Sequence, residues 1–220
     1  EYKKANYQQA IKDYEELLKY GVSPELYYNL GNSYYRINNI TRALINYERA
    51  SMLDPGNKDI RFNLQFVRNK TIDKYADDNE MFFVTWYKTI VNIASVDGWA
   101  KISVISVIFA LLLLLVYLFC ENVNLRKVGF FGSLAFIGCF IFSLLFAYQQ
   151  KYYFENRCGA IAISPVVNVK KTPSVGNTDE FIIHEGTKVY ITDRGMKGWI
   201  GVRLSDGREG WILKDQIEEI

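Results

Sequence analysis

Two long runs without a charged side chain constrain this sequence more than any other feature. Residues 102–119 and 128–148 contain no Asp, Glu, Lys or Arg. At a rise of about 1.5 Å per residue, a helix of either length crosses the roughly 30 Å hydrocarbon core of a bilayer. The alternative is a pair of buried helices in a soluble core, but neither run keeps a polar face. We therefore predict a transmembrane hairpin, which leaves both flanking parts of the chain on one side of the membrane.

Small residues recur along both predicted helices. Ser103, Ser106 and Ala110 form the first series, and a second series is spaced by four residues: Ala135, Cys139, Ser143 and Ala147. Small residues at this spacing let helix backbones approach closely in lipid. We expect packing within the hairpin, and docking of another membrane protein is the alternative. With no ionisable group in either run, a channel or a proton relay is not expected.

A spaced pattern of small and aromatic residues precedes the hairpin. It reads, in order, Tyr27, Leu30, Gly31, Tyr34, Ala43, Tyr47, Ala50 and Pro55. This spacing resembles the tetratricopeptide repeat, which has the pattern W-x2-L-G-x2-Y, A-x3-F and P over 34 residues. The small residues fit where two antiparallel helices touch, and the tyrosines fill the space around that contact. The differences are a Tyr for the first Trp, and Asn38 where Gly is common.

The repeat has partial neighbours on both sides. Ala10 and Tyr14 lie 33 residues before Ala43 and Tyr47, as expected for the second helix of a truncated preceding repeat. The segment 58–70 resembles a further first helix, with Gln65 in place of Gly, and we interpret it as a cap. Tetratricopeptide repeats bind peptides in a groove lined by their first helices. The repeat register predicts these groove residues: Tyr28, Asn29, Asn32, Tyr35, Arg36, Phe62 and Asn63. The alternative is that they form solvated surface.

The segment between the repeats and the hairpin is rich in large apolar residues. In residues 80–95, Phe82, Trp86, Ile90 and Ile93 fall near one face of a helix. We interpret this segment as an amphipathic helix lying in the membrane interface. A linker packed on the repeats is the alternative. Aromatic residues that border the two runs mark one interface of the bilayer: Trp99, Tyr148, Tyr152 and Tyr153.

After the hairpin the pattern changes to short alternating runs separated by turn signals. We predict five short strands in a small barrel, with Asp206-Gly207 as a tight hairpin turn. The stretches "VNVKKTPS", "HEGTKVYI" and "GWIGVRLSDGREGWI" resemble a bacterial SH3-type domain. Such domains often bind peptides or cell-wall fragments. The resemblance implies a ligand surface made by Tyr190, Trp199 and Trp211.

Several functions are not expected. Residues 1–78 carry 12 basic and 11 acidic residues and residues 159–220 carry 8 and 9, so neither end is a basic patch for nucleic acid. Cys120, Cys139 and Cys158 lack metal-ligand spacing. The single histidine, His184, has no nucleophile partner, and we interpret it as a surface residue. No phosphate loop or nucleophile elbow occurs. We predict no metal, no cofactor and no enzymatic activity.

The order of the parts carries a wider resemblance. The repeats, "SVDGWA", a hairpin containing "LRKVGFFG", "FAYQQ" and an SH3-type barrel together resemble the BatE family of the Bacteroides aerotolerance operon. This resemblance implies a bacterial inner-membrane protein with periplasmic soluble domains. It also implies partners among von Willebrand factor A-domain membrane proteins, encoded beside a MoxR-type AAA ATPase. The predicted parts are repeats at 1–78, a linker or interfacial helix at 79–98, membrane helices at 99–120 and 128–149 around a turn at 121–127, a linker at 150–158, and the barrel at 159–220.

Charge leaves the membrane orientation open. Arg126 and Lys127 lie in the turn, whereas Lys88, Lys101, Lys151 and Arg157 lie on the other side. The raw count favours cytoplasmic soluble domains, the charge density of the turn favours periplasmic ones, and the resemblance also implies the periplasm. We expect a membrane-anchored adaptor that performs no chemistry in an aerotolerance or envelope-stress complex. The alternative is a sensor whose SH3-type domain binds peptidoglycan.

Overall fold

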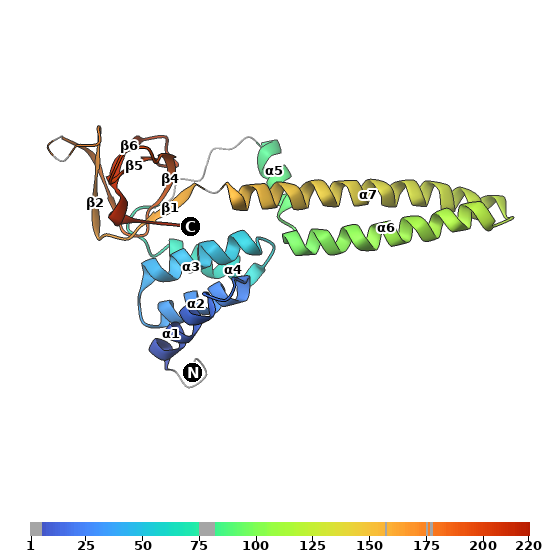
Figure 1. Ribbon diagram of the computed structural model, residues 1–220, viewed down its shortest axis with the longest axis horizontal. Helices are drawn as coiled ribbons and strands as arrows, with labels where there is room; N and C mark the ends of the chain where they lie inside the picture. The colour runs from blue at the N-terminus through green and yellow to red at the C-terminus, as the bar shows by residue number, and fades with distance from the viewer. Residues whose placement is uncertain (1–5, 75–81, 157, 175, 177) are drawn as a thin grey trace. The chain divides into compact units, whose positions relative to one another are not determined.

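The computed structural model describes residues 6–74, 82–156, 158–174, 176 and 178–220. These residues divide into two units. One unit joins the described parts of Glu1–Met81 and Arg157–Ile220, and the other is Phe82–Asn156. Figure 1 shows the helices of the repeat region, the strands and the two long helices. The predicted boundary at 78/79, the first residues of the repeat domain and Arg157 lie outside the described residues.

Four helices form the repeat region of the first unit: α1 (Tyr7–Leu17), α2 (Pro24–Arg36), α3 (Ile40–Leu53) and α4 (Lys58–Arg68). Local sequence sets where they begin. The Ser23 side chain accepts a hydrogen bond from the Leu26 amide, and Asn39 and Asn57 cap α3 and α4 in the same way. Asn38 has a φ of 63° between α2 and α3. Asn is tolerated there because its short polar side chain suits the left-handed region.

The helices touch where the repeat pattern has its small residues. A Cβ atom at Gly31 would lie 2.8 Å from the Tyr47 ring, so only glycine fits at this contact. Leu30, Ala43 and Ala50 are buried, and Tyr27, Tyr34 and Pro55 are half-buried around them. The Tyr34 hydroxyl donates to Glu15 of α1. Burial and this carboxylate raise the pKa of Tyr34 to about 12, so its hydroxyl remains a donor at neutral pH.

Seven strands of the same unit form one antiparallel sheet: β1 (Gly159–Ala162), β2 (Val166–Lys170), β3 (Asp179–His184), β4 (Lys188–Asp193), β5 (Trp199–Arg203), β6 (Glu209–Leu213) and β7 (Ile217–Glu219). The pairing order among the described residues is β3-β2-β6-β5-β4-β1-β7. The prediction of five strands is therefore wrong by two. The described pairings form an open sheet and do not by themselves confirm a barrel. Asp206-Gly207 forms the predicted β5–β6 turn, with Gly207 at a φ of 89°.

The repeat helices and the sheet share a hydrophobic core. Leu44 and Ile45 of α3 are fully buried and belong to one cluster with Ile161 of β1 and Ile220 at the chain end. From Thr41 to Glu48 every α3 residue except Arg42 is buried, because the helix has the repeat on one side and the sheet on the other. The sequence predicts that the repeats and the barrel are separate domains, whereas in the structure the repeat helices and the sheet belong to one unit.

Buried charges reinforce this junction. The Glu48 side chain on α3 is 4% exposed, and its carboxylate accepts hydrogen bonds from Arg68 Nε at 3.0 Å and Lys188 Nζ at 2.9 Å. Burial alone would raise the pKa of Glu48, but the charges of Lys188 and Arg68 outweigh burial and hold the pKa below its ordinary value of 4.5. Nearby, Arg49 donates to the Glu219 carbonyl at 2.7 Å and pairs with Glu218. The junction is therefore polar at its rim and apolar at its centre.

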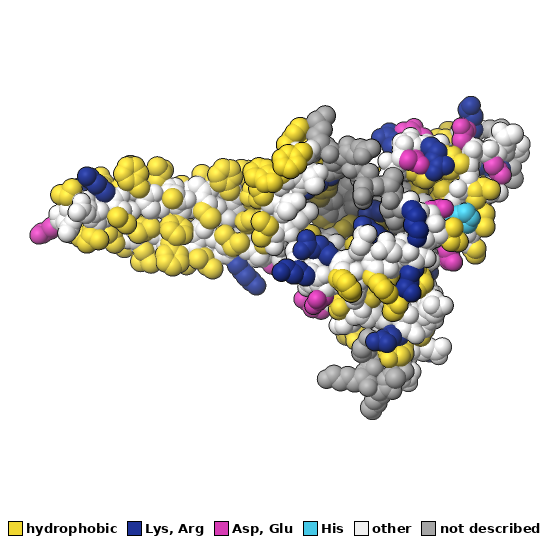
Figure 2. All heavy atoms as spheres, turned by 180° about the vertical axis from the view of Figure 1, so that it is seen from behind, with side chains coloured by type: hydrophobic (Ala, Val, Ile, Leu, Met, Phe, Trp, Pro, Cys, Tyr) yellow, Lys and Arg dark blue, Asp and Glu magenta, His cyan; other side chains and the backbone are white. Residues whose placement is uncertain are grey.

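The second unit contains α5 (Phe82–Val91), α6 (Val96–Phe119) and α7 (Val123–Glu155). By length and composition, α6 and α7 are each sufficient to cross a membrane. We call this pair the apolar hairpin, and Figure 2 shows hydrophobic side chains over most of its visible surface. The turn is shorter than the predicted 121–127, because the Asn122 side chain caps α7 through the Asn124 and Leu125 amides and starts the helix at Val123.

The two helices of the apolar hairpin touch through small residues. Ser103, Ser106 and Ala110 are the buried residues of α6, as the predicted stripe requires. On α7, Ser143 is buried, Ala147 is half-buried, and Cys139 lies at the edge within 3.4 Å of the Ser106 hydroxyl. Ala135 is exposed, so its place in the predicted stripe is wrong. Gly129 and Ser133 are buried instead. The four-residue spacing does not hold at the turn that contains Ala135, because the contact face rotates along the length of the helix.

Gly129 gives a direct test of this packing. A Cβ atom there would lie 2.7 Å from the Leu113 carbonyl oxygen and 2.8 Å from the Tyr117 nitrogen, both of which belong to the α6 backbone. Gly129→Ala should therefore force the helices apart and destabilise the hairpin by about 1–3 kcal/mol. Gly138→Ala is the control, because a Cβ at that position meets no atom within 4 Å. Thermal unfolding in detergent measures both, and equal effects would contradict the packing.

Candidate functional site

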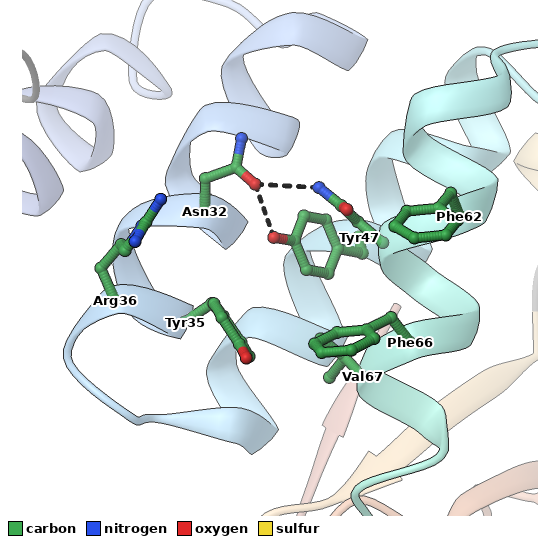
Figure 3. Close-up of a pocket in the computed structure, with 8 residues that line it drawn as sticks. Asn32, Tyr35, Arg36, Tyr47, Phe62, Phe66 and Val67 are labelled. Atoms are coloured by element: carbon green, nitrogen blue, oxygen red, sulfur yellow. Dashed lines mark hydrogen bonds between the residues drawn. The ribbon is translucent and has the colours of Figure 1, made fainter.

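A pocket of about 270 Å³ lies on the face of the repeat formed by α2 and α4, with α3 as its floor. Figure 3 shows the side chains of the two outer helices converging on it. Its lining consists of Asn32, Tyr35, Arg36, Tyr47, Phe62, Asn63, Phe66 and Val67. We call this site the repeat groove.

The repeat groove brings together five of the seven residues predicted for it: Asn32, Tyr35, Arg36, Phe62 and Asn63. Tyr28 lies at its margin, where its hydroxyl accepts a hydrogen bond from Asn63. Asn29 does not line the pocket. The prediction missed Tyr47, Phe66 and Val67. Phe66 lies four residues after Phe62 on α4, so the helical period alone would have found it.

An amide network holds the polar side of the groove. Asn32 Oδ1 accepts from the Tyr47 hydroxyl at 2.6 Å and from Asn63 Nδ2 at 3.1 Å, shown as dashed lines in Figure 3. These two bonds fix the Asn32 amide with its oxygen toward the floor of the groove. Among the described residues, Asn32 Nδ2 and Asn63 Oδ1 make no hydrogen bond. The groove therefore offers one donor and one acceptor from adjacent helices.

The other side of the groove is aromatic and positive. Phe62 is 70% exposed and Phe66 44% exposed, with stacked rings whose centroids lie 6.4 Å apart. Lys70 Nζ lies 5.2 Å from the Phe66 ring centroid. Arg36 is exposed beside them, and no described lining residue is acidic. The exposed pair therefore gives the groove an apolar contact surface next to its cationic side chains.

The three predicted aromatic residues of the sheet lie on one face. Trp211 is opposite Gly201, two residues from Trp199 on β5, and Tyr190 is opposite Arg203 on the same strand. Strand alternation therefore places all three on the side away from buried Ile200 and Val202. Each is half-buried.

His184 is part-exposed, with 33% of its side chain accessible, and it has a carboxylate partner that the sequence does not show. Its Nδ1 lies 3.0 Å from Asp73 Oδ1, and its backbone amide donates to Asp73 Oδ2 at 2.7 Å. The Thr187 hydroxyl donates to the same carboxylate. Burial would raise the pKa of Asp73, but these hydrogen bonds outweigh it and lower the pKa. His184 and Asp73 therefore connect the sheet to the segment that follows the repeat helices. No local sequence pattern predicts this role.

Comparison with known proteins supports the repeat. The family described as Tetratricopeptide repeat matches residues 24–57. These residues span α2, α3 and the cap of α4, and they include four of the eight residues that line the repeat groove. The chain thus contains a tetratricopeptide repeat, and this repeat indicates a role in protein–protein interaction.

Other similarities are short or distant. Rho guanine nucleotide exchange factor 5 of Mus musculus is 36% identical over 58 residues, which cover 26% of this chain and 4% of that protein. The C-terminal SH3 domain of Myosin IB from Entamoeba histolytica is 27% identical over 27% of this chain and 97% of its own, with a TM-score of 0.18. NlpC2 from Trichomonas vaginalis is 21% identical over 28% of this chain and 23% of its own, with a TM-score of 0.25. Neither structural likeness decides the fold of the sheet.

Proposed function

We propose that this protein is a membrane-anchored adaptor that binds an extended segment of a partner protein in the repeat groove. The observation that carries the proposal is the amide network, which presents Asn32 Nδ2 as a donor and Asn63 Oδ1 as an acceptor. An extended peptide has a main-chain carbonyl and N–H to match them. No catalytic step is part of this function.

The rest of the groove defines the class of ligand. Phe62 and Phe66 suit an apolar side chain of the bound segment, since burying their exposed rings is favourable. Arg36 and Lys70 suit an acidic group next to it. The proposed ligand is therefore an extended segment with an apolar anchor and an adjacent carboxylate.

The anchor is the apolar hairpin, which we propose spans the membrane twice. The first unit supports this topology. Its core combines residues before the hairpin with residues after it, such as Leu44 and Ile161. A chain that must return to the same core needs an even number of crossings. By the sequence resemblance to the BatE family, we place the protein in a bacterial inner membrane with periplasmic soluble parts. The same resemblance suggests A-domain membrane proteins as partners in an aerotolerance or envelope-stress complex.

A second candidate function rests on the sheet. We propose as the alternative that its outer aromatic face, with Tyr190, Trp199 and Trp211, belongs to an SH3-type domain that senses peptidoglycan or a peptide. The shared face of these residues favours it. Binding of soluble muropeptides to the full chain, lost on Trp211→Ala but retained on Asn32→Asp, would favour this function over the adaptor.

Asn32→Asp tests the adaptor function without removing the internal network. The new carboxylate can still accept from Tyr47 and Asn63, so thermal stability should change little. It removes the outward donor and puts a negative charge where a peptide carbonyl would lie. We expect binding of a peptide selected from a library on the full chain to weaken at least about tenfold, which corresponds to about 1.4 kcal/mol. Fluorescence anisotropy measures the affinity.

Gln65→Glu is the matched control for this change. It makes the same amide-to-carboxylate replacement on α4, but Gln65 is exposed and does not line the groove. Its peptide affinity should stay within about twofold of the parent, a difference of a few tenths of a kcal/mol. If both variants bind like the parent, the peptide does not use the groove. If both weaken equally, charge and not the Asn32 donor controls binding.

A further inference from the structure

Helix α5 carries an apolar face whose largest side chains are exposed among the described residues. Phe82 is 85% exposed, Phe83 62% and Trp86 61%. At about 100° per residue, these side chains and those of Tyr87 and Ile90 share an arc of roughly 140°. Thr85 and Thr89 lie outside this arc, and the hydroxyl of Thr89 bonds to the Thr85 carbonyl. We call the arc the α5 aromatic face.

The end of α5 is tied to the apolar hairpin at a defined level. The Val91 carbonyl accepts hydrogen bonds from Trp99 Nε1 of α6 at 2.8 Å and from Gln150 Nε2 of α7 at 2.7 Å. Gln150 Nε2 also donates to the Ala94 carbonyl at 2.8 Å. Gln150 is buried, and its Nε2 holds the connection between α5 and α6 against α7, whereas its Oε1 has no hydrogen-bond partner among the described residues. We call these hydrogen bonds the tether. They fix the end of α5 and do not involve its first residues.

Aromatic contacts show where along the apolar hairpin the end of α5 lies. The Phe146 ring centroid lies 5.0 Å from that of Trp99 and 6.3 Å from that of Tyr87. Phe146 is in the last turns of the uncharged run on α7, and Lys101 and Lys151 are the first charged residues beyond the uncharged runs at this end. A bilayer crossed by the hairpin would have its hydrocarbon boundary here, where Trp and Tyr are enriched.

We propose that the α5 aromatic face inserts into the interface of the same bilayer that the apolar hairpin spans, with lipid as its occupant. This inference rests on the proposed membrane crossing. Two observations favour lipid: the apolar surface of the hairpin continues onto α5 through Tyr87, Phe146 and Trp99, and the tether keeps α5 at the boundary level. An interfacial helix with one apolar and one polar side lies in this position. Helix α5 would then lie in the membrane interface and fix how deeply the apolar hairpin sits in the bilayer.

Bromolipid quenching of tryptophan tests the proposal on the full chain in liposomes. The chain has four tryptophans, at 86, 99, 199 and 211. Three variants each retain one of them, Trp86, Trp99 or Trp199, and carry Phe at the other three positions. With bromine on the acyl chains near the headgroups, we expect Trp86 and Trp99 each to lose about half of their fluorescence or more, because quenching requires near contact with lipid. Trp199, in the sheet, should be unaffected and serves as the control.

The outcomes separate the inference from the function on which it rests. Quenching of Trp99 without Trp86 would leave the membrane crossing intact and overturn the role of α5. Quenching of neither would overturn both. A second measurement avoids loss of the Trp99 tether: spin labels at Phe83→Cys and Thr85→Cys, with the three native cysteines replaced by serine. We expect oxygen to reach the label at 83 better and a water-soluble nickel reagent to reach the label at 85 better. Equal accessibility at both sites would contradict the proposal.

Discussion

Lys188→Met should lower the free energy of unfolding of the first unit by about 3 kcal/mol. The substitution keeps most of the side-chain volume but removes the charge 2.9 Å from the Glu48 carboxylate. Glu48 is 4% exposed and cannot turn to solvent, so a buried carboxylate is left with Arg68 as its remaining strong partner. Denaturant unfolding of the full chain in detergent measures the change. The fluorescence of Trp199 and Trp211 reports the sheet when Trp86 and Trp99 are replaced by Phe.

An exposed ion pair on the same sheet is the control. Arg203 and Glu209 pair across β5 and β6 with both side chains 56% exposed. Glu209→Ala should cost less than about 1 kcal/mol, because water solvates each charge when its partner is removed. Adding Glu48→Gln to Lys188→Met should recover part of the lost stability, since the amide removes the uncompensated charge. If the two single variants cost the same, the buried cluster does not stabilise the junction.

Acid should act through the same carboxylate. The folded-state pKa of Glu48 lies below its ordinary value of 4.5, so its contribution is complete above pH 4.5 and is lost as the pH falls through the lower folded value. Lys188→Met removes the largest cause of this lowering and should raise the folded pKa. The acid loss of stability in the variant should therefore begin at a higher pH than in the parent. The pH dependence of the unfolding midpoint measures this shift.

Gly186→Ala should have an effect of similar size, about 2–4 kcal/mol, from two separate costs. Gly186 has a φ of 84°, which costs an alanine about 1 kcal/mol or more. In addition, the new Cβ would lie 2.6 Å from Thr71 Cγ2 and 3.7 Å from Leu44 Cδ2, both of the repeat. Overpacking of this kind costs about 1–3 kcal/mol. Hydrogen exchange should rise in α3 and β4 together, because the clash separates the repeat from the sheet.

Gly207→Ala measures the cost of backbone strain alone. Gly207 has a φ of 89°, but a Cβ there meets no atom within 4 Å. Its substitution should cost only the strain, about 1 kcal/mol, with faster exchange confined to the β5–β6 turn. The difference between the two alanine variants therefore measures the contact between repeat and sheet. Equal losses of stability would mean that the two parts are not packed as one unit.

The repeat groove shows which features of a binding site the repeat register can predict. Positions such as Asn32 and Asn63 follow from the spacing of Gly31 and Leu64, because every repeat turns the same helix face toward the groove. The register does not say how an amide is oriented. That depends on the Tyr47 hydroxyl, fifteen residues away from Asn32 on another helix. Tyr47, counted as a packing residue in the sequence, therefore has two roles that only the three-dimensional arrangement combines.

Sequence by itself determined the features that repeat locally. The tetratricopeptide helices, the two apolar helices of membrane length and the β5–β6 turn all follow from periodicity, hydropathy and turn chemistry over short stretches of chain. Only the tertiary structure decided what these elements share. The core of Leu44 with Ile161, the Glu48 cluster with Lys188 and the contact of Gly186 with Thr71 each join residues more than 100 positions apart. Such contacts leave no periodic signal, because each partner is selected by the space that the other leaves after folding.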